Sequence, residues 1–88
     1  KLRREVDKSR RKISRLGKGK NGLFKDQERI RKNLGNVSSD SDIYRRYVKK
    51  LDAQENELED IAEALEKENA KLNESAEALA GYIAKLKI

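Results

Sequence analysis

The chain has 88 residues, the size of one small domain, with 43% charged residues, 35% hydrophobic residues and a formal net charge of +6. It contains no Cys and no His, which excludes zinc fingers and catalysis by a Cys or His side chain, and it leaves the redox compartment open. No apolar run approaches the roughly 20 residues of a membrane span or the core of a signal peptide.

Charge is unevenly divided along the chain. Residues 1–50 carry 18 Lys or Arg and 6 Asp or Glu, a net charge of +12. Residues 51–80 carry 2 basic and 10 acidic residues, a net charge of −8. A basic half followed by an acidic half indicates two segments that attract each other and leave positive charge for a partner.

The first segment, about residues 1–34, has the apolar spacing of a helix. Two series with heptad spacing run through it, one from Leu2 to Val37 and one from Val6 to Leu34. Both series keep their phase across the glycine-rich stretch 17–22, so we expect one continuous helix. Three glycines cost a helix about 1 kcal/mol each relative to alanine, and a genuine break at 17–22 is the alternative.

Residues 35–41 read as a turn. Gly35 stands where a helix C-cap glycine is expected, in the left-handed conformation. Ser39 with Asp42 forms a capping-box pattern for the next helix, and Ser41 is a competing N-cap.

The second segment, about residues 42–88, carries the clearest pattern. A ladder with heptad spacing begins at Tyr44, continues through leucines and ends at Leu86. A second series with the same spacing runs from Val48 to Ile83 and supplies the other core position of each heptad; we call its members the companions of the ladder. A heptad repeat sustained over this length is typical of a coiled coil.

Two long helices joined by a short turn predict an all-α fold, an antiparallel coiled-coil hairpin that spans residues 1–88 as a single unit, either as a monomer or as a dimer. If Leu34 lies opposite Tyr44, then Ile30 pairs with Val48, and Val6 pairs with Leu72. The predicted helix-pairing seam comprises Leu2, Val6, Ile13, Leu16, Leu23, Ile30, Leu34, Val48, Leu51, Leu58, Ala62, Leu65, Leu72 and Ala76.

One polar layer is predicted within that seam. Ser9 falls opposite Asn69 in this register, and a buried polar pair would specify the alignment of the two helices. Beside it we expect Arg10 to face Glu66 and Lys12 to lie near Glu68. Exposed pairs of this kind select orientation more than they add stability.

We expect no catalytic residue, cofactor or metal site, and therefore no enzyme. Residues 17–22 lack the Lys-Ser/Thr pair of a phosphate-binding loop and do not follow a strand. The acidic group Glu55, Glu59, Asp60 and Glu63 has helical spacing, but a two-helix hairpin offers no cleft to shift a carboxylate pKa.

Electrostatic binding of nucleic acid or an anionic surface is the alternative function. The basic first helix could neutralise phosphates, although the chain is poor in aromatic residues on which bases stack. A parallel zipper through the second helix is a further alternative, but residues 35–41 cut short the basic helix that a DNA-binding zipper needs. The candidate phosphate contacts are Lys8, Arg11, Lys12, Arg15, Lys18 and Lys25.

Three stretches together carry a family resemblance: 26–34, 41–47 and 51–58, with 82–86 near the end. They resemble the C-terminal region of the bacterial mucoidy-inhibitor-A-like proteins, a conserved domain without an assigned function. The motif residues are Asp26, Gln27, Arg29, Arg31 and Asn33.

The resemblance implies a helical arm cut from a longer bacterial chain and a periplasmic or envelope setting. It also directs attention to Gln27, which we expect to hydrogen-bond Gln54 across the hairpin and hold the turn end closed. The expected function is a structural or interaction module for helix pairing or oligomerisation. Its expected partners are the rest of the parent chain and a second copy, bound through an apolar strip of Leu79, Tyr82, Ile83 and Leu86.

Overall fold

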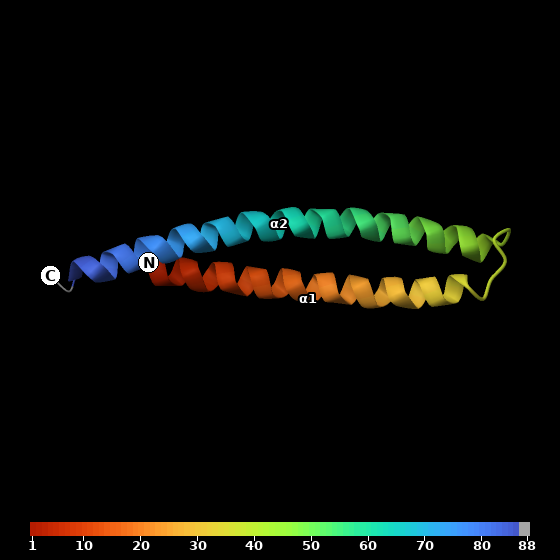
Figure 1. Ribbon diagram of the computed structural model, residues 1–88, viewed down its shortest axis with the longest axis horizontal. Coiled ribbons are helices and arrows are strands. Elements are labelled where there is room, and N and C mark those ends of the chain that lie inside the picture. The colour runs from red at the N-terminus through yellow and green to blue at the C-terminus, as the bar shows by residue number, and fades with distance from the viewer. Residues whose placement is uncertain (87–88) are drawn as a thin grey trace. The chain divides into compact units, whose positions relative to one another are not determined.

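A computed structural model describes residues 1–86. Helix α1 spans Leu2–Leu34 and helix α2 spans Asp42–Leu86, and no strand occurs in the described range. The two helices pack against each other as a helical hairpin, which confirms the predicted fold class (Figure 1). Residues 87–88, the predicted end of the second helix, lie outside the described residues.

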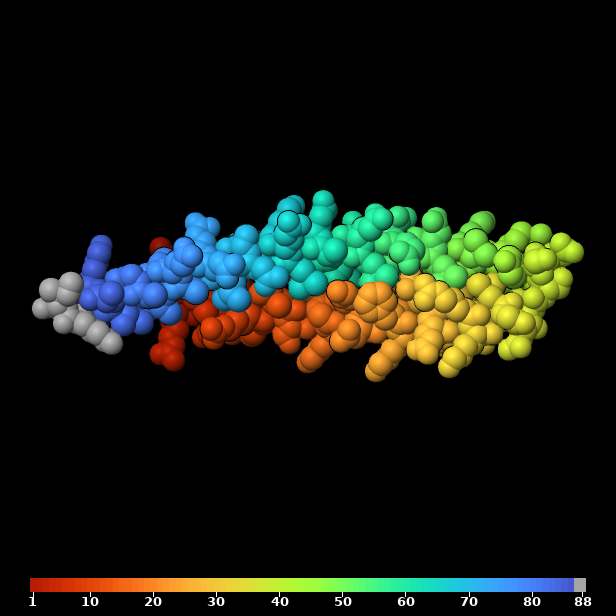
Figure 2. Space-filling view, in the orientation of Figure 1, coloured from red at the N-terminus to blue at the C-terminus, as the bar shows by residue number. Residues whose placement is uncertain are grey.

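The hairpin divides into two compact units. The terminal unit comprises Lys1–Gly17 and Glu63–Ile88, and the turn unit comprises Lys18–Ala62. In each unit a segment of α1 packs along a segment of α2. In the space-filling view, long side chains of α1 project away from α2 (Figure 2).

Helix α1 continues without interruption through the glycine-rich stretch 17–22. None of its glycines has a positive φ, so the backbone there is ordinary right-handed helix. Leu16 and Leu23 on either side of the stretch are half-buried. The unbroken heptad phase of the first segment therefore predicted the helix correctly, and the alternative of a break is wrong.

The turn differs from the prediction in its capping. Gly35 does not adopt a positive φ, so it is not a left-handed C-cap. Its amide donates to the Arg31 carbonyl at 3.4 Å, which extends the helical pattern by one residue. Ser41, not Ser39, is the N-cap of α2, because its Oγ accepts from the Tyr44 amide at 3.1 Å.

Helix α1 turns a mixed apolar and polar face toward α2. Val6 and Ile30 are buried, at 4% and 0% exposure. Ser9 and Gln27 are buried on the same face. The other seam residues expected on α1 are half-buried: Leu2, Ile13, Leu16, Leu23 and Leu34.

Helix α2 turns the residues on one side of its heptad ladder toward α1. This side is not the one that the sequence predicted. The ladder residues Tyr44, Leu51, Leu58, Leu65, Leu72 and Leu79 are half-buried. Next to the ladder, the side chains turned inward are Tyr47, Gln54, Ile61, Glu68 and Ser75, each one residue before the predicted companion. Of the predicted companions, Val48, Ala62 and Asn69 are exposed and Ala76 is half-buried.

The physical reason is that a ladder residue has neighbours on both sides. Residues three and four positions further along a helix share its face, so a ladder alone does not say which of the two flanks meets the partner helix. The predicted choice followed hydrophobicity. The observed choice follows the polar contacts described next, and it also shifts the alignment of the two helices.

Candidate functional site

The most organised group of side chains in the turn unit surrounds Asp26. Its Oδ1 accepts hydrogen bonds from Arg29 Nε at 3.0 Å and Arg29 Nη2 at 2.9 Å. Its Oδ2 accepts from Gln54 Nε2 of α2 at 2.6 Å, and Lys50 Nζ lies 3.5 Å from the same oxygen. One carboxylate on α1 thus holds two side chains of α2.

These contacts keep Asp26 ionised. The hydrogen bond from Arg29, followed by that from Gln54, lowers the pKa of Asp26 below its ordinary value. The same carboxylate raises the pKa of Arg29. Asp26 therefore remains a charged acceptor, and hydrogen bonds to a charged group are the stronger ones.

A second bridge crosses the hairpin one residue further along. Gln27 is 1% exposed, and its Nε2 donates to Glu55 Oε1 at 2.8 Å. The expected bond between Gln27 and Gln54 is therefore wrong. Each of these amides instead donates to a carboxylate of the opposite helix, because a charged acceptor outcompetes a neutral amide oxygen.

A third contact lies nearest the turn. Asn33 Nδ2 donates to the Tyr47 hydroxyl at 3.3 Å. Four of the five motif residues, Asp26, Gln27, Arg29 and Asn33, thus take part in side-chain bonds in the turn unit. The fifth, Arg31, is exposed. We call the bonded set of Asp26, Gln27, Arg29, Asn33, Tyr47, Lys50, Gln54 and Glu55 the polar clamp.

Sequence reasoning found only part of the polar clamp. Glu55 was assigned to an exposed acidic group, Tyr47 and Lys50 were given no place between the helices, and Gln54 was expected there with the wrong partner. Gln54 offered the clearest signal, because an amide three residues after a ladder residue occupies a position that can face the partner helix.

The polar clamp leaves one polar atom without a partner. Gln54 is 5% exposed, and its Oε1 is buried and accepts no hydrogen bond among the described residues. An unpaired buried acceptor costs about 1–3 kcal/mol. The bond from its Nε2 to Asp26 offsets part of this cost.

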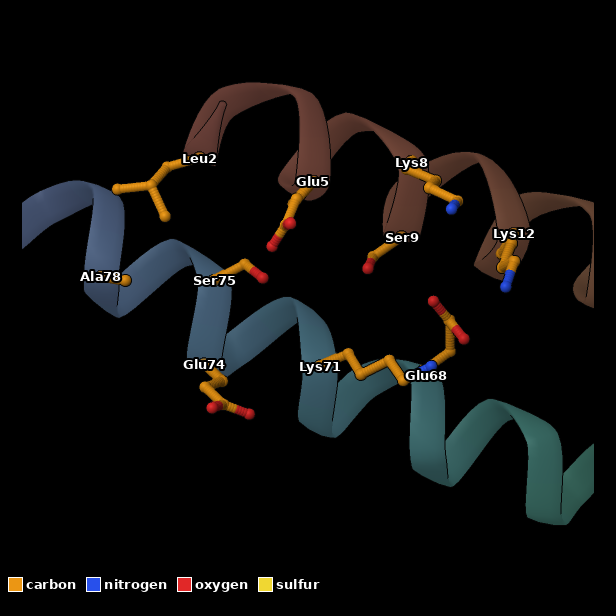
Figure 3. Close-up of a pocket in the computed structure, with 10 residues that line it drawn as sticks. All are labelled: Leu2, Glu5, Lys8, Ser9, Lys12, Glu68, Lys71, Glu74, Ser75 and Ala78. Carbon is orange, nitrogen blue, oxygen red and sulfur yellow. The ribbon is translucent and has the colours of Figure 1, made fainter.

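The terminal unit has a polar layer of its own, but not the predicted one. Ser9 and Glu68 are buried, at 6% and 8% exposure, whereas Asn69 is exposed. Figure 3 shows the Glu68 side chain reaching from α2 toward Ser9 on α1. The groove beside this layer also brings Leu2 of α1 next to Ala78 of α2.

Beside that layer Lys12 and Glu68 line the same groove, as expected, but neither expected pair forms an ion pair within 4.0 Å. In the described part of the terminal unit, no Lys or Arg nitrogen lies within 4.0 Å of a carboxylate oxygen. Arg10, Lys12 and Glu66 are exposed, so water screens their charges instead.

Other candidate residues remain on the surface. The acidic residues Glu55, Glu59, Asp60 and Glu63 are exposed, and among residues 1–86 no acidic group is arranged to hold a metal ion. Tyr82, Ile83 and Leu86 of the expected apolar strip are 55%, 43% and 68% exposed, and Leu79 is half-buried. The candidate phosphate contacts are all exposed.

Over the described residues, neither helix combines the length and the apolar character that crossing a membrane requires. Comparison with protein-family models, with curated proteins and with solved structures found no match to this chain.

Proposed function

We propose that this chain is a structural module that pairs helices in a defined alignment and presents them to other helices. The observation that carries the proposal is the polar clamp, which joins α1 to α2 through Gln27–Glu55 and Gln54–Asp26. Buried polar contacts of this kind specify one alignment of two helices better than leucines do, since leucines slide at little cost.

The resemblance to the mucoidy-inhibitor-A-like proteins belongs to this proposal. Its motif residues are the ones that form the α1 side of the polar clamp, apart from the exposed Arg31. Their role in such a module is structural. A bacterial envelope setting and a dimer through Leu79, Tyr82, Ile83 and Leu86 are further parts of the proposal.

A cysteine crosslink tests whether the hairpin acts as a preformed unit. A Cβ added at Gly19 would lie 4.0 Å from Ile61 Cδ1, so positions 19 and 61 face each other, and the chain has no native cysteine. We expect a short bis-maleimide to join Gly19→Cys to Ile61→Cys within one chain, and the linked chain to migrate faster on a denaturing gel. The locked protein should keep the association state of the unlocked one.

The matched control pairs Gly19→Cys with Glu57→Cys. Glu57 is exposed on α2 and lies one helical turn before Ile61, so this pair should be linked more slowly. A covalent dimer from the Gly19–Ile61 pair, or loss of association after locking, would show that the helices pair between chains and would contradict the proposed module.

Anion binding through α1 is the second candidate. It is favoured by four basic residues of the terminal unit, Lys8, Arg11, Lys12 and Arg15, which are exposed and form no ion pair with any residue that the structure describes. Labelled DNA titrated at about 50 and about 200 mM salt tests it, because phosphate contacts lose affinity steeply over this range. A structural module should show no binding at either salt concentration.

A further inference from the structure

Helix α1 covers one flank of the α2 ladder more fully than the other. In the turn unit the buried flank of the ladder holds Gln54 and Ile61, while the opposite flank holds Val48, Glu55 and Ala62. Val48 is 45% exposed. Val48 and Ala62 are apolar residues outside the contact with α1, and they widen the apolar stripe of α2 beyond the part that α1 covers.

The uncovered flank borders a groove within the turn unit. The groove has a volume of about 370 Å³, and Phe24 of α1 stands over it with 48% of its surface exposed. Leu58 and Ala62 line the α2 side. We call it the Phe24 groove, and its lining residues are Lys20, Phe24, Gln27, Arg31, Glu55, Leu58, Glu59 and Ala62.

The surface of the chain leaves room for an interface of ordinary size. The chain exposes 7123 Å². A compact monomer of 10.1 kDa exposes about 5300 Å². The excess is larger than the roughly 800 Å² per partner that a standard interface buries.

The charges around the Phe24 groove are divided by helix. Lys20 and Arg31 stand on the α1 side, and Glu55 and Glu59 stand on the α2 side. The groove therefore has one basic edge and one acidic edge. A second copy of the same groove is complementary to it, provided that basic edge meets acidic edge.

Symmetry allows two ways of placing two such faces together. A two-fold axis across the helices sets α1 on α1, which brings basic edges together. A two-fold axis parallel to the helices sets α1 of each copy on α2 of the other, antiparallel to it. The second arrangement places Lys20 near the second copy's Glu59 and Phe24 over its Leu58.

We propose that two copies of this chain associate through the Phe24 groove, with α1 of each copy lying on α2 of the other. This inference rests on the proposed function, a helix-pairing module, and places the contact between two copies at the Phe24 groove in place of the strip of Leu79, Tyr82, Ile83 and Leu86. Phe24 is the central anchor, and the two Lys20–Glu59 contacts select the orientation.

Sedimentation velocity over a range of concentrations tests the association. We expect the wild-type chain to form a dimer, and Phe24→Ser to raise its dissociation constant about 30-fold, the effect of a typical hot-spot residue. Ile43→Ser is the matched control, because Ile43 is 50% exposed and lies outside the groove. A second variant, Tyr82→Ser, tests the strip near the end of α2.

The outcome of these variants decides between faces. A dimer weakened by Phe24→Ser and not by Ile43→Ser or Tyr82→Ser supports the Phe24 groove. A dimer weakened only by Tyr82→Ser, or a chain that stays monomeric at all concentrations, overturns it.

Charge reversal tests the orientation. Lys20→Glu alone and Glu59→Lys alone should each weaken self-association, because each creates two like-charged contacts per dimer. Mixing the two variants should restore a heterodimer, in which both contacts are attractive. If α1 packed on α1 instead, Lys20→Glu would pair well with the wild-type chain and Glu59→Lys would have little effect.

Circular dichroism separates failure of this inference from failure of the proposed function. A monomeric chain that is fully helical and forms the Gly19–Ile61 crosslink overturns the dimer and leaves the helix-pairing module intact. A chain that is not helical as a monomer and does not crosslink contradicts both.

Discussion

Buried side chains in this hairpin are mostly polar. Val6 and Ile30 are the buried apolar residues of the described chain, while Ser9, Gln27, Gln54 and Glu68 are buried and polar. Polar groups add little net stability when buried, but they penalise every alignment that leaves them unpaired. At the scale of single residues, the hairpin therefore favours a unique alignment over maximal stability.

The Gln27–Glu55 bond should be sensitive to loss of its acceptor. Glu55→Ala leaves the Nε2 of the buried Gln27 without a partner, which costs about 1–3 kcal/mol. The free energy of unfolding from urea titrations should fall by this amount. Glu57→Ala removes an exposed carboxylate two residues away and should change the free energy of unfolding little. Equal effects of Glu55→Ala and Glu57→Ala would show that the Gln27–Glu55 bond contributes nothing.

Asp26 should make stability depend on pH in acid. Its pKa is lowered in the folded chain by Arg29 and Gln54, so its contribution is complete above the unfolded-state pKa of about 3.9 and is lost as the pH falls through the folded-state pKa. At pH 7 the melting temperature of the wild-type chain should be higher than that of Asp26→Asn. The difference between the two melting temperatures should shrink below about pH 4.

The matched control for Asp26 is Asp60→Asn. Asp60 is exposed and accepts no side-chain hydrogen bond in the described structure, so its variant should follow the wild-type melting curve more closely at every pH. A difference between wild type and Asp26→Asn that stays constant from neutral pH to acid would contradict the role assigned to Asp26.

At the scale of elements, the continuity of α1 through residues 17–22 is the informative feature. Glycine is a poor helix former, and a short stretch with three of them is helical only because the apolar positions on both sides keep contact with α2. A Cβ added at Gly17 or Gly22 would meet no atom within 4 Å. No close approach of another backbone therefore requires glycine at these two positions.

Alanine at these positions should stabilise the hairpin. We expect Gly17→Ala and Gly22→Ala to raise the free energy of unfolding by about 1 kcal/mol each, because alanine gains helix propensity without a clash. Thermal melts followed by circular dichroism measure the gain. Gly35→Ala, outside the helices, should give a smaller increase in the free energy of unfolding. If Gly17→Ala and Gly22→Ala gave no increase, the helix would be frayed at these positions in solution.

At the scale of the whole molecule, the hairpin keeps its ladder residues only half-buried and leaves large apolar side chains such as Phe24 and Ile43 exposed. Half-buried leucines give less than the roughly 1.5–3 kcal/mol of full burial. A chain of this kind gains most from a partner that covers its remaining apolar surface, which is the physical basis of the dimer proposed above.

The proposed dimer predicts that stability depends on concentration. Association stabilises the folded state by mass action, so the melting temperature of the wild-type chain should rise between about 1 and about 100 μM. Phe24→Ser should reduce this dependence, and Ile43→Ser should retain it. A wild-type melting temperature that is the same at both concentrations would contradict the dimer.

The sequence by itself determined the two helices, their bounds to within a residue or two, the turn at 35–41 and the antiparallel hairpin. These features follow from heptad spacing and loop length, which are local properties of the chain. The same reasoning singled out Gln27 as a bridging residue but assigned it the wrong partner.

Only the tertiary structure decided which flank of α2 faces α1. The sequence predicted that Val48, Ala62 and Asn69 face α1, whereas the structure turns Tyr47, Ile61 and Glu68 toward it. Helix geometry alone does not distinguish the two flanks, because both lie next to the ladder residues. The choice agrees with where Asp26 finds its partner, Gln54, which stands 28 residues away along the chain. Heptad spacing therefore predicted that the helices pair, while contacts between distant polar residues set the alignment in which they do so.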